Sequence, residues 1–174
     1  KIMKIIKTKF KNLLIFQNQR FDDNRGYFRE LTKRKEVKKN LIFTVVSSSK
    51  KNVLRGMHMQ TKNMQGKFIS VIKGKILDVV IDCRKKSKTF AKHYKIVLSD
   101  KNCKSIYIPP GFAHGFLSLE KENIVVYSCT KYRNAKSEIS IKWNDKNLKI
   151  NWPIKKPILS KKDSEAKTFN EYKF

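Results

Sequence analysis

Residues 67–82 read KFISVIKGKILDVVID, two apolar runs separated by the turn sequence Lys73-Gly74-Lys75. Both runs are rich in β-branched residues, and a glycine between two such runs is typical of a turn that joins antiparallel strands. Runs of similar length recur on both sides of this stretch: LLIFQ (13–17), LIFTVV (41–46), VLRGMHMQ (53–60), HYKIVL (93–98), SIYIPPG (105–111), AHGFLSL (113–119), IVVYSCTKY (124–132) and ISIKW (139–143). Short strands at this spacing predict an all-β protein, and we expect a jelly roll.

Length and composition indicate a single domain. The chain has 174 residues, of which 40% are hydrophobic, enough for one full core over residues 1–174. Helical periodicity is weak throughout. Residues 28–39, FRELTKRKEVKK, and the tail after Ser160 are each expected to hold one short peripheral helix.

The formal net charge of +27 raises the question of a nucleic-acid partner. The charge comes mostly from lysines scattered over the whole length, and only seven residues are arginine, the side chain that recognition surfaces favour. No long basic block or basic-aromatic motif is present. We therefore expect a solvated basic surface and no nucleic-acid partner.

The cysteines and the N-terminal segment bear on the compartment. Cys83, Cys103 and Cys129 are too few and too dispersed for a disulfide framework or a zinc knuckle, which favours a reducing compartment. The longest apolar run near the N-terminus, residues 13–16, is too short for a signal-peptide core or a membrane span. A cytoplasmic protein without a membrane partner is expected.

The run at residues 53–60 carries two polar groups, Arg55 and His58. Alternate residues of a strand share a face, so a regular strand would point these two side chains in opposite directions. Strand twist, or a bulge at Gly56, would turn both into one cavity.

Jelly rolls of this size include metal-binding cupins, which present His-x-His on one strand. Here Gln60 occupies the place of the second histidine, and the three histidines His58, His93 and His114 fall in three separate strands. A three-histidine site remains the alternative. We expect no metal and no other cofactor.

Four polar side chains lie in runs that otherwise form core: His58, Lys67, His114 and Tyr127. Each alone is more typical of a core or surface residue. Together they offer a base, a phenol and cations, which proton removal beside a carbonyl requires. The base takes the carbon-bound proton, the cations stabilise the enolate oxygen, and the phenol returns a proton.

Several motifs follow one another in order over residues 16–163, and together they resemble one family. They are FDDNRGYFRE, VLRGMHMQ, QGKFISVIKGKILDVVIDCRKKSKTF, IPPGFAHGFLSL, E.SIKWND..LKINWP and ILSKKD. This combination is similar to the dTDP-4-dehydrorhamnose 3,5-epimerase family, which acts on nucleotide-linked 4-keto sugars. The resemblance implies a metal-free, cupin-like jelly roll that works as a homodimer.

The resemblance also implies roles for single residues. It places the general base on His58, the carboxylate that orients it on Asp163 and the opposing acid on Tyr127. The substrate contacts that it implies fall on Arg55, Gln60, Lys67 and His114, on Phe21, Arg25 and Glu30 near the nucleotide, and on Tyr132 at the mouth of the site. Phe43 and Val45 stand where the family usually carries glutamine and asparagine, and Arg133 where it usually has tyrosine.

The leading interpretation is therefore an epimerase that inverts C3 and C5, or C3 alone, of a nucleotide-linked 4-keto-6-deoxyhexose for surface polysaccharide synthesis. A 3,4-ketoisomerase on the same scaffold is the second interpretation. It uses a similar enediol but moves the carbonyl. A non-catalytic basic binding module is the third, although such a module needs no acid–base set.

Overall fold

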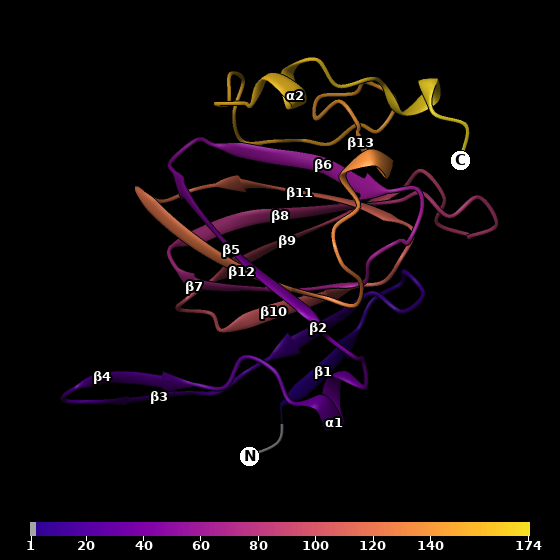
Figure 1. Cartoon of the computed structure of the whole chain (residues 1–174). Helices are drawn as coiled ribbons and strands as arrows, with labels where there is room; N and C mark the ends of the chain where they lie inside the picture. Colours follow the sequence, from indigo (N-terminus) through magenta and orange to yellow (C-terminus); the bar gives the residue numbers. More distant parts are fainter. Residues whose placement is uncertain (1–2) are drawn as a thin grey trace.

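The computed structural model describes residues 3–174 and contains two antiparallel sheets that face each other, as in a cupin-like jelly roll (Figure 1). The six-stranded sheet has the order β1 (Lys4–Lys7), β2 (Leu14–Gln17), β10 (Lys104–Ile108), β7 (Lys67–Lys73), β12 (Glu122–Cys129) and β5 (Phe43–Lys50). The five-stranded sheet has the order β13 (Glu138–Ser140), β6 (Leu54–Gln60), β11 (Phe112–Ser118), β8 (Lys75–Asp82) and β9 (His93–Ser99).

The apolar runs found in the sequence are strands, and the two short helices are confirmed as α1 (Arg34–Val37) and α2 (Lys161–Ser164). Two 3₁₀ turns, η1 (Ala135–Ser137) and η2 (Phe169–Glu171), complete the helical segments described. Across residues 3–174, no helix is long and apolar enough to cross a membrane.

Three strands were not predicted. All four residues of β1 are exposed, so its sequence carries no burial pattern. Strands β3 (Arg20–Asp23) and β4 (Gly26–Arg29) form a hairpin that projects from the body (Figure 1) and buries neither face in this chain. Strands without a buried face lack the alternation that predicts them from sequence.

The main core lies between the two sheets, and alternation along the strands supplies it. On β7, Ile69 and Val71 point inward and are fully buried; on β8, Ile76 and Val80 meet them from the other sheet. The outer face of the five-stranded sheet is covered by the C-terminal segment, whose Trp152 and Phe169 pack against it. The barrel is therefore filled at its centre, which leaves room for a ligand only at its ends and edges.

A bulge in β6 confirms the expectation for Gly56. His58 pairs with His114 and Arg55 with Phe116, so two residues of β6 lie opposite the single residue Gly115 of β11. The extra residue places Arg55 and His58 on the same face. Only glycine fits at position 56, because a Cβ there would lie 2.5 Å from the Gly115 Cα.

Candidate functional site

A cavity of about 630 Å³ opens between the two sheets at the end where β6, β7 and β12 meet. Five of the residues predicted for the site line it: Arg55, His58, Lys67, Tyr127 and Asp163. His58 comes from the five-stranded sheet and Tyr127 from the six-stranded sheet. A ligand in the cavity would therefore lie between them. The volume is in the range of sites that bind small molecules.

His58 and Asp163 form a hydrogen-bonded pair across 105 positions of sequence. Nε2 of His58 lies 2.5 Å from Oδ1 of Asp163, whose side chain is only 3% exposed. Ser160 caps α2 by accepting a hydrogen bond from the Asp163 amide, which fixes the start of the helix that carries the carboxylate. Neutral His58 that donates from Nε2 keeps the lone pair of Nδ1 free, which is the arrangement of a general base.

The charge state of Asp163 follows from this pair. Burial alone would raise the pKa of Asp163, but the hydrogen bond and charge of His58, with the Ser160 contact, outweigh burial and lower it. The residue is therefore a carboxylate at neutral pH. It can stabilise the imidazolium that forms when His58 takes a proton.

Tyr127 presents its phenol from β12. Its Oη lies 3.0 Å from the Ser47 hydroxyl of the neighbouring strand β5. Burial raises the pKa of Tyr127 to about 12, while the Ser47 hydrogen bond and the charge of Arg55 act in the opposite direction. The phenol is thus protonated at neutral pH and can act as a proton donor.

Two cations face the cavity without a carboxylate partner among residues 3–174. Arg55 is held by neutral groups, with Nε donating to the Ser49 hydroxyl at 2.9 Å and Nη2 to the Ser48 carbonyl at 3.0 Å. Burial lowers the pKa of Lys67, whose ammonium group makes no hydrogen bond or ion pair within the described chain. The Arg55 guanidinium and the Lys67 amino group thus remain available to an anionic or enolising ligand.

Three charged residues at the cavity were not predicted. Glu138, at the start of β13, forms ion pairs with Lys162 and with Arg133, whose Nε lies 3.3 Å from the carboxylate. Burial would raise the pKa of Glu138, but these two cations lower it to about 2. The sequence signals were an acidic residue directly before the apolar run at 139–143, a lysine next to Asp163, and Arg133 in place of the tyrosine usual in the resembling family.

His114 and Gln60 lie outside the cavity wall. His114 is 4% exposed and bonds through Nε2 to the buried Asp78 at 2.7 Å, with its ring 6.3 Å from that of Tyr127. Gln60 is equally buried and braces two loops, because its amide donates to the Asn63 carbonyl and accepts from the Asn134 amide. The structure therefore places both residues behind the residues that line the site.

The residues matched to nucleotide binding are spread over the surface of this chain. Phe21 and Arg25 lie on the projecting hairpin, with Arg25 paired to Asp23, and Glu30 pairs with Lys33 at 2.6 Å. None of the three predicted residues lines the cavity that holds His58. Tyr132 is 67% exposed, and its ring packs edge-on against Phe43, which does line the cavity.

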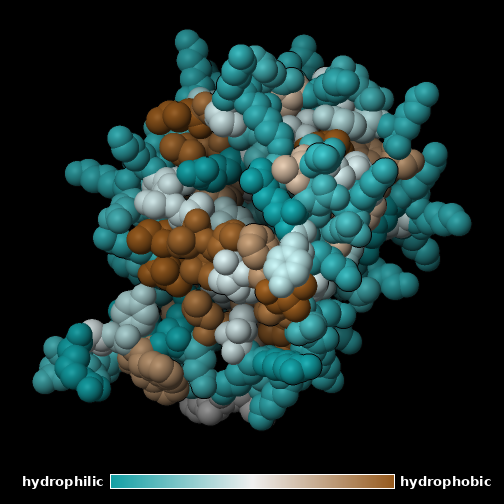
Figure 2. All heavy atoms as spheres, viewed as in Figure 1, coloured by the Kyte–Doolittle hydropathy of each residue, from teal (hydrophilic) through white to brown (hydrophobic). Residues whose placement is uncertain are grey.

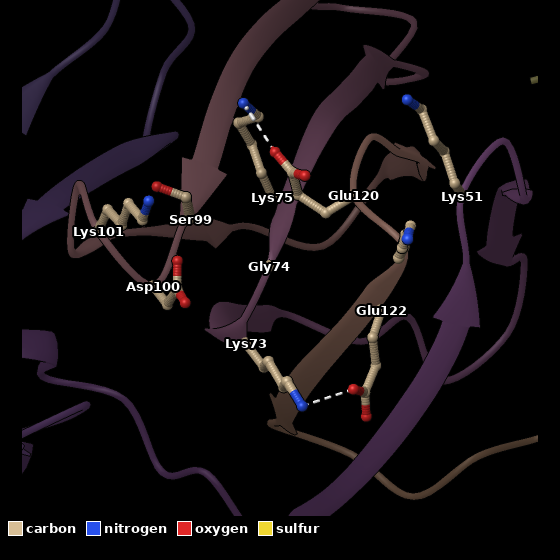
Figure 3. A pocket seen from close by; sticks show the side chains of 10 residues that line it. Lys51, Lys73, Gly74, Lys75, Ser99, Asp100, Lys101, Glu120 and Glu122 are labelled. Atoms are coloured by element: carbon tan, nitrogen blue, oxygen red, sulfur yellow. Dashed lines mark ion pairs between the residues drawn. The ribbon is translucent and has the colours of Figure 1, made fainter. Parts of the chain in front are cut away.

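A second cavity of similar size, about 650 Å³, lies between Gly74 and the β11–β12 connection (Figure 3). Two of its five lysines form ion pairs, Lys73 with Glu122 and Lys75 with Glu120. It contains no histidine, tyrosine or cysteine. Acid–base chemistry is therefore assigned to the cavity of His58 and Tyr127.

Comparison with known proteins agrees with this geometry. A family model described as dTDP-4-dehydrorhamnose 3,5-epimerase matches residues 7–171. The dTDP-4-dehydrorhamnose 3,5-epimerase from Shigella flexneri is 38% identical, and the match covers 96% of each chain. The protein of the same name from Neisseria gonorrhoeae is 40% identical over 96% of this chain, which spans about half (53%) of that protein. The crystal structure of dTDP-6-deoxy-D-glucose-3,5-epimerase from Legionella pneumophila, in complex with dTDP-4-keto-L-rhamnose, is 37% identical with a TM-score of 0.92 over 97% of this chain and 94% of that one.

Proposed function

Since the chain belongs to the dTDP-4-dehydrorhamnose 3,5-epimerase family, we propose that it inverts C3 and C5, or C3 alone, of a nucleotide-linked 4-keto-6-deoxyhexose. The protein is an isomerase. The reaction would serve the synthesis of a surface polysaccharide, and a cytoplasmic location stays a prediction.

The observation that carries this proposal is the placement of a base and an acid on opposite sheets of one cavity. His58, held by Asp163, takes the proton from the carbon beside the ketone, and the electron pair moves onto the carbonyl oxygen to form an enolate. Arg55 and Lys67 stabilise the developing negative charge. Tyr127 then delivers a proton to the other face of the same carbon, which inverts the centre.

An NMR screen of 4-keto-6-deoxyhexoses linked to different nucleotides tests the function. An epimerase produces a sugar inverted at C3, or at C3 and C5, with the ketone still at C4. A ketoisomerase would instead yield a ketone at C3. Binding without turnover of any of these sugars would favour the non-catalytic module.

Metal removal provides a further prediction. Within the described part of the chain, no group of three or more histidine, cysteine or carboxylate side chains is placed to hold a metal ion. The side-chain amide of Gln60 is already hydrogen-bonded to Asn63 and Asn134. We expect activity to survive dialysis against a strong chelator. Loss of activity that is restored by one divalent metal would contradict the metal-free mechanism.

We also propose that the enzyme works as a homodimer. Val46, on the outer face of the edge strand β5, is 65% exposed, and the hairpin adds Phe21 and Phe28, which are 50% and 65% exposed. Figure 2 shows apolar side chains gathered on this face, above the point where the hairpin leaves the body. An exposed apolar face beside a projecting aromatic hairpin is typical of an interface. The predicted nucleotide contacts of Phe21, Arg25 and Glu30 would then be made in the partner's site.

A charge on this face tests the dimer. In a two-fold interface each substitution occurs twice, so Val46→Lys is expected to weaken association at least about a hundredfold. Val97→Lys is a matched control, because Val97 is 41% exposed on β9 of the other sheet. Sedimentation velocity over a dilution series gives both dissociation constants. Equal association of the two variants would rule this surface out.

A further inference from the structure

Ser47 is the one residue within hydrogen-bonding distance of the Tyr127 phenol among residues 3–174. It lies on β5 two positions from Val45, the residue that pairs with Tyr127 across the strands, so all three side chains are on the inner face. Ser47 and Tyr127 both line the cavity and both are partly exposed, and burial is the largest influence on the pKa of Tyr127. The serine hydroxyl is thus in contact both with the phenol and with the open space of the cavity.

The direction of this hydrogen bond decides where the phenolic proton can go. Either hydroxyl could be the donor. If Ser47 donates, its hydrogen occupies a lone pair of the Tyr127 oxygen and leaves the phenolic hydrogen free to point at a ligand. If Tyr127 donates, its proton is directed at Ser47 and away from the substrate.

Proton delivery leaves a phenolate in a largely buried place. An unpaired buried anion is costly, and a hydrogen bond to a charged group is worth more than one to a neutral group. The Ser47 hydroxyl is already at 3.0 Å and can donate to the phenolate without rearrangement. It also provides a path for recovery: as a solvent acid protonates the serine oxygen, the serine proton passes to the phenolate, and the neutral phenol is restored.

We propose that Ser47 is a positioning residue of the epimerisation: it aims the Tyr127 proton at the sugar, stabilises the phenolate, and relays the proton that restores the phenol. This inference rests on the proposed function, because it assumes that Tyr127 is the acid. Ser47 would then assist the acid Tyr127 in the way that Asp163 assists the base His58.

The neighbouring serines indicate that this part of β5 is built to hold side chains of the cavity. The Ser49 hydroxyl and the Ser48 carbonyl hold Arg55, whose charge also acts on Tyr127. The segment 47–49 therefore sets the position of the acid and of one cation together. A hydroxyl pair on the outer face of the same two strands, Thr44 with Ser128 at 3.1 Å, offers a matched control.

The test compares two rates in D₂O with an accepted 4-keto sugar: deuterium uptake at the inverted carbon, and formation of the inverted product. Exchange needs only His58, whereas inversion also needs Tyr127. Ser47→Ala is expected to keep exchange close to wild type and to slow inversion roughly tenfold or more, the scale of a hydrogen bond to a charged group. Ser47→Thr should restore inversion, and Ser128→Ala should leave both rates unchanged.

A double variant assigns the effect to the tyrosine. In a Tyr127→Phe background there is no phenol to assist, so adding Ser47→Ala should change neither rate further. If Ser47→Ala lowered exchange and inversion by the same factor, the role of Ser47 would be overturned while the proposed function stood. The same conclusion would follow if Ser47→Ala slowed inversion equally in the wild-type and Tyr127→Phe backgrounds. A wild-type protein that neither exchanges nor inverts any 4-keto sugar would overturn the proposed function and this inference with it.

Discussion

Replacement of His58 by asparagine is expected to lower turnover at least about a hundredfold, the usual scale for loss of a general base. Asparagine has no group that can take a proton from carbon near neutral pH. It is neutral and smaller than histidine, so it fits the same place in β6, although it is too short to reach the Asp163 carboxylate that lies 2.5 Å from Nε2 of His58 in the wild type. The fold and ligand binding should therefore persist, and deuterium exchange at the sugar carbon should stop along with inversion.

The matched control is His93→Asn. His93 lies on β9, half-buried, and bonds to the Leu148 carbonyl at 3.0 Å; it does not line the cavity. This variant should keep wild-type turnover under the same assay. Near wild-type turnover of His58→Asn, with the substrate still binding, would assign the base to another group.

Asp163→Asn should also impair turnover, by a comparable or smaller factor. The variant keeps a similar shape but removes the charge that stabilises the His58 imidazolium. Because the pKa of Asp163 is lowered in the folded protein, its carboxylate also stabilises the fold above the pKa of the unfolded chain, and this contribution is lost as the solution becomes more acidic. Thermal unfolding near neutral pH measures that loss separately from turnover.

Much of the fold follows from apolar runs in the sequence. Strand β7 is buried on both faces, with Ile69 and Val71 in the main core and Phe68 in a second cluster, and its apolar run predicts it. The apolar residues of the β3–β4 hairpin are exposed and only its arginines Arg20 and Arg29 are partly buried, so hydrophobic periodicity gives no sign of it. The bulge was one of two predicted ways, beside strand twist, to bring Arg55 and His58 into one cavity, and the structure shows why glycine is needed there: a Cβ at position 56 would meet the backbone of Gly115.

The site could not be predicted from local sequence patterns alone. His58 and Asp163 are 105 positions apart, and only the packing of α2 against β6 brings them together, so the pair came from the family resemblance. Ser47 was not predicted as a site residue, although it stands two positions after Val45, where the pattern of the resembling family continues with a serine. Its contact depends on the pairing of β5 with β12, which places its hydroxyl beside that of Tyr127.

Replacement of Tyr127 by phenylalanine should separate the two halves of the reaction. The ring still packs near Phe116 and His114, whose ring centroids are each 6.3 Å away, so the core is kept while the donor is lost. His58 still removes the proton, and the enolate still forms beside Arg55 and Lys67. The enolate can then recover a proton only from the His58 face, which regenerates the starting stereochemistry.

The expected result is an enzyme that incorporates deuterium but rarely inverts. Exchange in D₂O should continue at a rate set by His58, while the inverted product falls at least about a hundredfold, the usual scale for loss of a general acid. Tyr94→Phe is the control, because that tyrosine lies on β9 and packs against Phe10 outside the cavity. Inversion by Tyr127→Phe at the wild-type rate would mean that water or another side chain is the acid and that Tyr127 serves packing. Loss of exchange together with inversion would instead place Tyr127 in the first proton transfer, because formation of the enolate would then depend on the phenol.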